Sequence, residues 1–293
     1  MPEKYFQMGS RELWQSQNFL RRPETVANLL EKTDINRSDL VVEIGPGKGI
    51  ITKELVKRAG RVIAVEIDPK LAATLEEYFQ DTTNIQIIEI DFLKWELPTE
   101  PYKVFSSIPF NMTADIVRKL TESKHPPLVA YLIMQDEASF RFMGNSQISM
   151  LIAPWFEVRK ILNIDRREFE PTPNVNIVLV EFRKREKPLV TEENRQIFRD
   201  FVIYGYNQWQ PTVFDAFKNI FSSKQRAILE KELKIRSLKP SDLTIEQWIK
   251  LFETFLNFVP QEKKHIVKGA ERSLKEMQKR LRKWHRTRSP IKK

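Results

Sequence analysis

Short runs of apolar, β-branched residues alternate with stretches of helical periodicity over residues 40–183. Apolar runs of five to eight residues indicate strands, whereas apolar residues spaced three and four apart indicate helices. Seven strands are predicted in this region, with helices between the first of them: 40–45, 61–67, 85–90, 103–108, 128–134, 157–164 and 176–182. This alternation predicts a mainly parallel, doubly wound α/β sheet, which binds ligands at the carboxyl ends of its strands. The domain built around it is predicted to span residues 1–187.

Beyond this region the pattern is helical only. Ser222 and Thr244 are each followed three residues later by a glutamine, Gln225 and Gln247, in the spacing of a capping box. Such a box satisfies backbone N–H groups in the first turn of a helix. A small all-helical domain is therefore predicted at residues 188–260.

The last segment, residues 261–293, combines helical periodicity with a concentrated positive charge. The chain has 49 Lys or Arg against 39 Asp or Glu, and 13 of the basic residues but only 2 of the acidic ones lie from Lys263 onward. Apolar residues recur there at steps of three and four, which predicts a basic amphipathic helical tail: Val267, Ala270, Leu274, Met277, Leu281 and Trp284. A basic arm suits nucleic acid, and a solvated tail without a partner is the alternative.

Composition narrows the classes of site. Because the chain has no Cys, neither a disulfide nor a thiolate metal site can form. The three His residues are scattered and match no metal-ligand spacing, so no metal is expected. No apolar run has the length of a membrane span, and the N-terminal sequence lacks a signal-peptide core. A cytoplasmic protein without a membrane partner is expected.

Three glycines directly follow the first predicted strand, and acidic residues end the next two. Gly45, Gly47 and Gly49 allow a tight turn and let a ligand lie against bare backbone. Glu66 ends the second strand, where it can accept hydrogen bonds from ribose hydroxyls, and Asp91 ends the third, where it can accept from an adenine amino group. A dinucleotide site would use a similar turn, but no second nucleotide-binding half follows. S-adenosylmethionine is therefore favoured over NAD.

The fourth strand ends in the tetrapeptide Ser107-Ile108-Pro109-Phe110. This order has the outline of a motif that methylates amino groups on nucleobases, except that Asn or Asp normally occupies the first position. Taken alone, Pro109 and Phe110 would more simply be a strand-ending turn with a core aromatic. The interpretation as a methyltransferase motif is favoured because the tetrapeptide follows the glycine turn and the two acidic strand ends.

In motif order, from about Ser16 to Arg183, the chain resembles the Erm ribosomal RNA adenine N6-methyltransferases, relatives of the KsgA dimethyladenosine transferases. The matching segments are SQNFL (16–20), EIGPGKG (43–49), VEID (65–68), IDFL (90–93), SSIPF (106–110) and FEPTPNVN (169–176). The family has Asn in place of Ser107 and Asp in place of Asn176. The resemblance implies a Rossmann-like class I methyltransferase domain of seven strands, followed by a helical domain.

The resemblance also implies roles for individual residues. Cofactor contacts are implied for Asn18, Leu20, Gly45, Gly47, Gly49, Glu66, Asp91, Phe92 and Ser107. Catalytic roles at the target base are implied for Ser107, Ile108, Phe110 and Phe169, and for Pro109, which stiffens the turn through its fixed φ. Hydrogen-bond acceptors aimed at the N6 hydrogens make that nitrogen more nucleophilic, and an aromatic face can stack on the base. For Phe169 the alternative is a packing residue.

The activity implied by the resemblance is N6-methylation of an adenine in 23S ribosomal RNA by a monomer, with resistance to macrolide-type antibiotics. A single methyl is favoured over two, because the Ser107 hydroxyl reaches less far than an Asn amide. One alternative is a KsgA-like enzyme that acts on small-subunit RNA. Another is a noncatalytic RNA-binding or ribosome assembly factor on the same fold.

Overall fold

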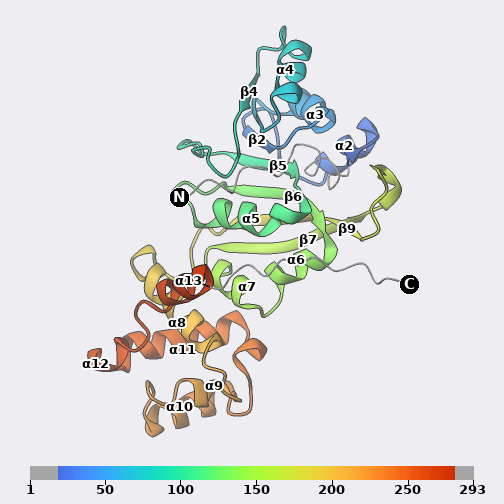
Figure 1. Cartoon of the computed structure of the whole chain (residues 1–293). Helices are drawn as coiled ribbons and strands as arrows, with labels where there is room; N and C mark the ends of the chain where they lie inside the picture. The colour runs from blue at the N-terminus through green and yellow to red at the C-terminus, as the bar shows by residue number, and fades with distance from the viewer. Residues whose placement is uncertain (1–18, 281–293) are drawn as a thin grey trace. The chain divides into compact units, whose positions relative to one another are not determined.

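The structure is a computed structural model that describes residues 19–280, and the chain divides into two units, Met1–Pro188 and Leu189–Lys293 (Figure 1). The division lies one residue from the boundary expected after residue 187. Within the described residues, no helix is long and apolar enough to cross a membrane.

A single seven-stranded sheet organises the first unit. Its strands are β2 (Leu40–Ile44), β3 (Arg61–Glu66), β4 (Ile85–Glu89), β5 (Lys103–Ser107), β6 (Val129–Gln135), β7 (Phe156–Ile164) and β9 (Ile177–Lys184). Their order is β4-β3-β2-β5-β6-β9-β7, and the five strands from β4 to β6 are parallel. Strand β9 runs antiparallel to both β6 and β7, so the sheet is mixed at that edge. The predicted seven-stranded Rossmann-like fold is confirmed.

Helices connect the strands of this sheet and bury its apolar faces. They are α2 (Pro23–Leu30), α3 (Ile50–Arg58), α4 (Pro69–Tyr78), α5 (Thr113–Glu122), α6 (Asp136–Met143) and α7 (Gln147–Ile152), with the short 3₁₀ turns η1 (Phe110–Met112) and η2 (Arg166–Glu168). Helix α4 begins at Pro69 because the Asp68 carboxylate accepts from the N–H groups of Lys70 and Leu71 and Pro69 suits the first helical position. This helix start fixes the end of the loop that follows β3.

Two very short strands form a second, separate pairing in the first unit. Strand β1 (Phe19–Leu20) pairs antiparallel with β8 (Phe169–Glu170), and the N–H of Arg21 donates to the carbonyl of Glu168 at 2.8 Å. Each strand has two residues, too few for a period-two pattern to be detectable in sequence. The pairing brings Phe19 and Leu20 beside the segment that follows β7.

The second unit is helical throughout its described residues. Its elements are η3 (Glu192–Asn194), α8 (Arg195–Tyr206), α9 (Val213–Ala216), α10 (Ser223–Leu233), η4 (Pro240–Asp242), α11 (Ile245–Phe258), α12 (Gln261–Lys264) and α13 (Ala270–Arg280). The capping boxes predicted at Ser222 and Thr244 are both present. The core is aromatic, with the Phe201 ring 4.6 Å from that of Phe217 and 4.9 Å from that of Phe255.

The described part of the basic segment begins as an integral part of this unit. The buried Arg199 guanidinium donates to both oxygens of the buried Glu271, at 3.0 and 2.8 Å. Asp200 accepts from the backbone N–H groups of Gly269 and Glu271, each at 2.9 Å, and so caps the start of α13. Helix α13 begins only at Ala270, and Val267, the first residue of the predicted apolar stripe, lies in the turn before the helix. The stripe therefore does not lie on one continuous helix. Residues 281–293 lie outside the described part of the chain.

Candidate active site

The glycine turn after β2 leaves open space beside its backbone. Gly45 and Gly47 have positive φ angles of 65° and 57°, which glycine adopts without the steric cost of a Cβ. A Cβ built at Gly45 would meet no heavy atom within 4 Å, whereas one at Gly47 would lie 2.6 Å from the Phe19 ring. The turn is therefore bare at Gly45, where a ligand can lie against the main chain, and covered by Phe19 at Gly47.

The carboxylate of Glu66, at the end of β3, anchors this turn. It is 3% exposed and accepts from the N–H groups of Gly47 at 3.0 Å, Ile67 at 2.9 Å and Asp68 at 3.0 Å. Two of these donors reach one oxygen and Gly47 reaches the other. A carboxylate has about four acceptor positions, two on each oxygen. The oxygen that accepts from Gly47 therefore has one acceptor position left, which a ligand hydroxyl can use.

The turn after β4 carries Asp91 and Phe92 and is held from α5. One Asp91 oxygen accepts from the N–H of Leu93 at 2.9 Å. The Lys119 ammonium donates to the carbonyls of Leu93, at 3.0 Å, and Trp95, and it lies 5.3 Å from the centroid of the Phe92 ring. Burial lowers the pKa of Lys119, and the charge of Asp91 opposes that shift. Lys119 therefore fixes the turn on which Asp91 and Phe92 lie.

These strand ends line one pocket, which combines apolar walls with two carboxylates. Its lining residues are Ile44, Gly45, Val65, Glu66, Ile67, Asp68, Pro69, Leu71, Ile90, Asp91, Phe92, Pro109, Met112 and Ile116. Apolar walls can take a flat heterocycle, and few convergent polar groups fix its orientation. Glu66 and Asp91 supply acceptors for the hydroxyls and the amino group of a nucleoside. We call this site the nucleoside pocket.

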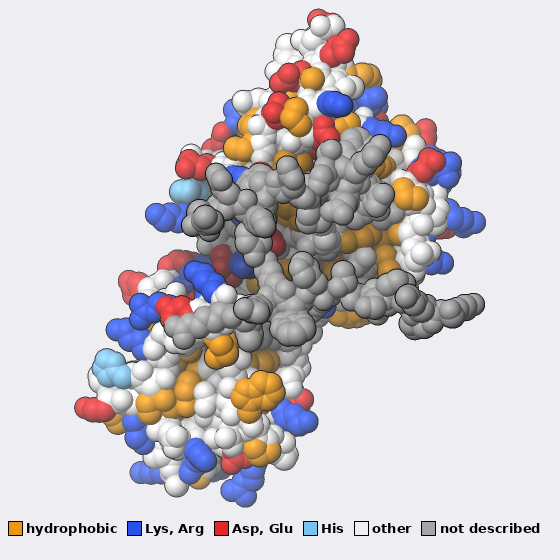
Figure 2. Space-filling view, viewed as in Figure 1, with side chains coloured by type: hydrophobic (Ala, Val, Ile, Leu, Met, Phe, Trp, Pro, Cys, Tyr) orange, Lys and Arg blue, Asp and Glu red, His pale blue; other side chains and the backbone are white. Residues whose placement is uncertain are grey.

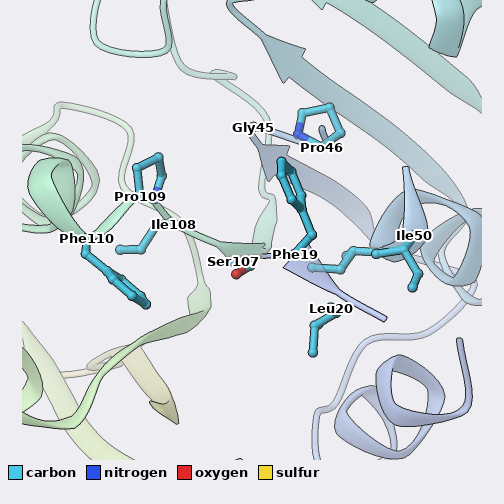
Figure 3. A pocket seen from close by; sticks show the side chains of 10 residues that line it. Phe19, Leu20, Gly45, Pro46, Ile50, Ser107, Ile108, Pro109 and Phe110 are labelled. Carbon is cyan, nitrogen blue, oxygen red and sulfur yellow. The ribbon is translucent and has the colours of Figure 1, made fainter. Parts of the chain in front are cut away.

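A second pocket lies on the other side of Gly45 and Pro109. Its lining residues are Phe19, Leu20, Gly45, Pro46, Ile50, Ile51, Ser107, Ile108, Pro109 and Phe110. Figure 3 shows the Ser107 hydroxyl between the Phe110 ring on one side and Phe19 and Leu20 on the other. Nothing among the described residues hydrogen-bonds that hydroxyl. We call this site the tetrapeptide pocket.

The tetrapeptide itself is held at both ends. The N–H of Ile108 donates to the carbonyl of Ile133 on β6 at 3.2 Å, and the Ile108 side chain is buried. The carbonyl of Pro109 accepts from the N–H of Met112 at 3.0 Å, which starts the η1 turn. Pro109 also fixes its own φ, here −60°. Ser107 and Phe110 are thus presented from a rigid backbone.

A buried acidic side chain lies behind the glycine turn. Glu43, on β2, is fully buried, and one of its carboxyl oxygens lacks a hydrogen-bond partner among the described residues. Burial raises the pKa of Glu43 to about 8; Thr52 opposes this shift and Glu66 adds to it. At neutral pH Glu43 is therefore mostly protonated.

The family model for ribosomal RNA adenine dimethylase matches residues 14–257. The chain belongs to this family. It is accordingly an S-adenosylmethionine-dependent rRNA methyltransferase, as its motifs indicated. The nucleoside pocket fits that cofactor, because it offers a bare glycine backbone, an apolar slot and two carboxylates that can accept from the hydroxyls and the amino group of a nucleoside.

Individual relatives fall into two groups within this methyltransferase family. An rRNA adenine N-6-methyltransferase of Aeromicrobium erythreum is 34% identical over 196 residues, which are 65% of this chain and 57% of that protein. The structure is also similar to the crystal structure of the 23S rRNA methyltransferase ErmE, with a TM-score of 0.75 and 28% sequence identity. The aligned region covers 82% of this chain and 100% of the ErmE chain. A ribosomal RNA small subunit methyltransferase A of Latilactobacillus sakei is 28% identical over 80% of this chain and 86% of its own length.

Most predicted site residues of this methyltransferase line the two pockets, with four differences. Gly47 lines neither pocket, because the Phe19 ring covers it. Gly49 lines neither pocket: its φ is 77°, and an added Cβ would lie 2.6 Å from Leu75, so packing against α4 requires glycine there. Phe169 is 1% exposed and packs in the core, which corresponds to the packing alternative; its contact with the base stays a prediction. Asn18 lies outside the described residues.

Sequence reasoning did not identify several residues that shape the site. Phe19 lines the tetrapeptide pocket only because β1 pairs with β8, and no local signal marks that pairing. Lys119 lies in a predicted helix, and no local sequence signal marks its contact with the turn after β4. Glu43 lies in the quoted glycine motif, and its position in the middle of an apolar strand was an available signal of a buried carboxyl group.

Proposed function

We propose that this methyltransferase transfers one methyl group from S-adenosylmethionine to N6 of an adenine in 23S ribosomal RNA. The observation that carries the proposal is that the nucleoside pocket and the tetrapeptide pocket share Gly45 and Pro109. A cofactor against Gly45 and a base against Phe110 would then approach each other across this shared wall. Holding two reactants in such an arrangement supplies much of the rate of a transfer reaction.

When bound, S-adenosylmethionine supplies the activated methyl group, and the residues of the chain supply orientation and polar contacts. No residue in the described part of the chain hydrogen-bonds to the Ser107 hydroxyl, so this hydroxyl can accept a hydrogen bond from the N6 amino group. Together with the backbone carbonyl of Ile108, this acceptor would favour a pyramidal nitrogen whose lone pair is available, and would stabilise the positive charge that develops there. The Phe110 ring would hold the base by stacking.

The preference for a single methyl group follows from the length of the Ser107 side chain. An Asn amide oxygen reaches further than a Ser hydroxyl, and a hydroxyl can also donate. The hydrogen bond that N6 donates to Ser107 is therefore weaker than the one it would donate to Asn. A weaker hydrogen bond can suffice to position the unmodified amino group but positions an amino group that already carries a methyl poorly. We therefore expect monomethyladenosine as the main product.

The choice of the large subunit is supported by the similarity to ErmE, a 23S rRNA methyltransferase whose structure covers 82% of this chain with a TM-score of 0.75. The similarity to the small subunit methyltransferase of Latilactobacillus sakei supports the alternative of small-subunit RNA. With the 23S substrate we further propose a monomeric, cytoplasmic enzyme that confers resistance to macrolide-type antibiotics.

Tritiated methyl transfer to deproteinised 23S RNA and to immature small subunits tests the proposal, with mass spectrometry of the modified nucleotide. Label in 23S RNA as monomethyladenosine supports it, and the Phe110→Ala variant should lose most of that label. Label only in small subunits would establish the alternative substrate. Abundant dimethyladenosine from the unaltered protein would overturn the single-methyl claim, and no label in either RNA would overturn the proposed substrate.

A further inference from the structure

Trp209 in the helical unit is exposed in a way that packing does not explain. The side chain is 97% exposed, the largest value among the exposed large hydrophobic residues of the described chain. Its φ is 51°, and Lys234 is the only other non-glycine residue with positive φ between residues 19 and 280. A bulky aromatic residue in this left-handed region is a genuine outlier, and such residues concentrate at functional sites.

The loop that carries Trp209 is fixed at both ends. Before it, the Tyr206 ring stacks on Trp248 with centroids 5.5 Å apart, and the Asn207 amide donates to the carbonyl of Ile203 at 2.7 Å. After it, the N–H of Val213 donates to the carbonyl of Leu238 at 2.8 Å. Because both ends are anchored, the exposure of Trp209 is a property of the folded unit and not of a frayed terminus.

The same anchors place the loop beside a basic segment. Leu238, which accepts from Val213, lies in the connection between α10 and η4. Trp248, which stacks on Tyr206, also donates to the carbonyl of Pro240 at 3.3 Å, so residues 234–240 are joined to both ends of the loop, directly at Val213 and through Trp248 at Tyr206. Lys234, Arg236 and Lys239 in this connection are exposed. None of the three forms an ion pair with another residue of the described chain.

The surrounding sequence is also basic, because acidic side chains are few and partly engaged. Residues 207–240 contain seven Lys or Arg and three Asp or Glu. Of the acidic ones, Glu230 accepts from the backbone N–H of Arg236 at 2.6 Å, and Asp215 accepts from the Thr212 hydroxyl at 2.7 Å. Figure 2 shows Lys and Arg side chains spread over the visible face of the helical unit, with exposed hydrophobic side chains between them.

We propose that Trp209 stacks on an unpaired base of the RNA substrate, while Lys234, Arg236 and Lys239 contact the neighbouring phosphates. An exposed aromatic ring on a loop that adjoins a basic segment suits single-stranded nucleic acid, since every base has a π face and every nucleotide a negative charge. RNA is favoured over an apolar protein surface because the adjoining connection carries three exposed cations that form no ion pair with another described residue. The inference depends on the chain acting on RNA, but not on which ribosomal subunit supplies it.

Fluorescence anisotropy with two RNA probes tests the proposal on the full-length protein at low salt. One probe is a 12-nucleotide RNA that cannot pair with itself, and the other is a fully paired duplex of equal length. Trp209→Ala should weaken binding of the single strand about 5- to 100-fold, the range of one base–aromatic stack, and change duplex binding less than about twofold. Trp209→Phe should retain most of the affinity. The matched control is Phe258→Ala, an aromatic residue that is 70% exposed on α11 with ordinary helical backbone.

Protein stability and cofactor affinity separate this inference from the proposed function. Because the ring is exposed, Trp209→Ala should unfold at the same temperature as the unaltered protein and bind S-adenosylmethionine equally well. If Trp209→Ala binds both RNA probes as tightly as Phe258→Ala does, the stacking site is wrong while the methyltransferase assignment stands. An equal loss on both probes would also overturn stacking, because a duplex offers no unpaired base. If the unaltered protein binds neither probe nor ribosomal RNA, the inference and the proposed substrate fail together.

Discussion

Replacing Glu66 by Gln should affect both cofactor binding and folding stability, because this carboxylate anchors the glycine turn before any ligand arrives. The amide oxygen of Gln can keep the two hydrogen bonds from Ile67 and Asp68, but the amide NH₂ group then faces the N–H of Gly47. One buried donor is left unsatisfied, which costs about 1–3 kcal/mol. The free energy of unfolding should fall by that amount.

The cofactor should bind Glu66→Gln more weakly for two reasons: the turn is less well held, and a charged acceptor for the ribose is lost. A hydrogen bond to a charged group contributes about 1.5–3 kcal/mol, so the dissociation constant of S-adenosylmethionine should rise about 10- to 150-fold. Asp91→Asn gives a contrast, because an amide oxygen can still accept from the N–H of Leu93. It should weaken the cofactor without changing the free energy of unfolding by more than about 0.5 kcal/mol.

Isothermal titration calorimetry and urea unfolding measure the two effects separately. Glu89→Gln is the matched control, since Glu89 is an exposed carboxylate at the end of β4 and does not line the nucleoside pocket. An unchanged cofactor affinity in both Glu66→Gln and Asp91→Asn would refute the assignment of the nucleoside pocket. A Glu66→Gln protein as stable as the Glu89→Gln control would refute the anchoring role of Glu66 and leave the pocket itself untouched.

Four further predictions concern the reaction, the cofactor turn and the helical unit. Phe110→Ala should lower single-turnover methylation more than Ser107→Ala, for which about 1–2 kcal/mol, or roughly 5- to 30-fold, is the expected upper limit. Lys119→Met should weaken cofactor binding in calorimetry, because two backbone carbonyls lose their donor; Lys119→Arg should restore part of it. Burial raises the pKa of Glu271, yet bonds from basic and amide side chains lower it to about 2 from 4.5. Its stabilising contribution is therefore complete above about pH 5 and lost as the pH falls towards 2, so urea unfolding of Glu271→Gln should differ from the unaltered protein less in acid. Deleting residues 281–293 removes six Lys or Arg, and if these neutralise about three phosphates, the log affinity–log salt slope for single-stranded RNA should flatten by about 2.

The fold was largely predictable because its strands are short apolar runs and its helices begin at residues with capping chemistry. Each carries its signal within a few residues, as Asp68 and Ser222 illustrate. The acidic strand ends Glu66 and Asp91 were predictable for a related reason, since parallel strands place their carboxyl ends at one edge of the sheet. What could not be predicted is contact between segments far apart in sequence. The pairing of β1 with β8 joins residues 150 positions apart through two-residue strands, and this pairing places Phe19 in the tetrapeptide pocket.

The basic segment shows how such a distant contact changes the interpretation of a charge pattern. Counted along the sequence, residues 261–293 form one positively charged arm that could be removed as a whole. In the folded unit, however, Glu271 forms a buried pair with Arg199, and Asp200 caps the helix that starts at Ala270. Removing one partner of a buried ion pair leaves an uncompensated charge and costs about 3–5 kcal/mol. A truncation before Ala270 would therefore test the folding of the helical unit, and its effect on RNA binding could not be attributed to lost positive charge. A truncation after residue 280 keeps the ion pair and the cap, so the cationic residues beyond that point can be tested for phosphate contacts on a unit that still folds.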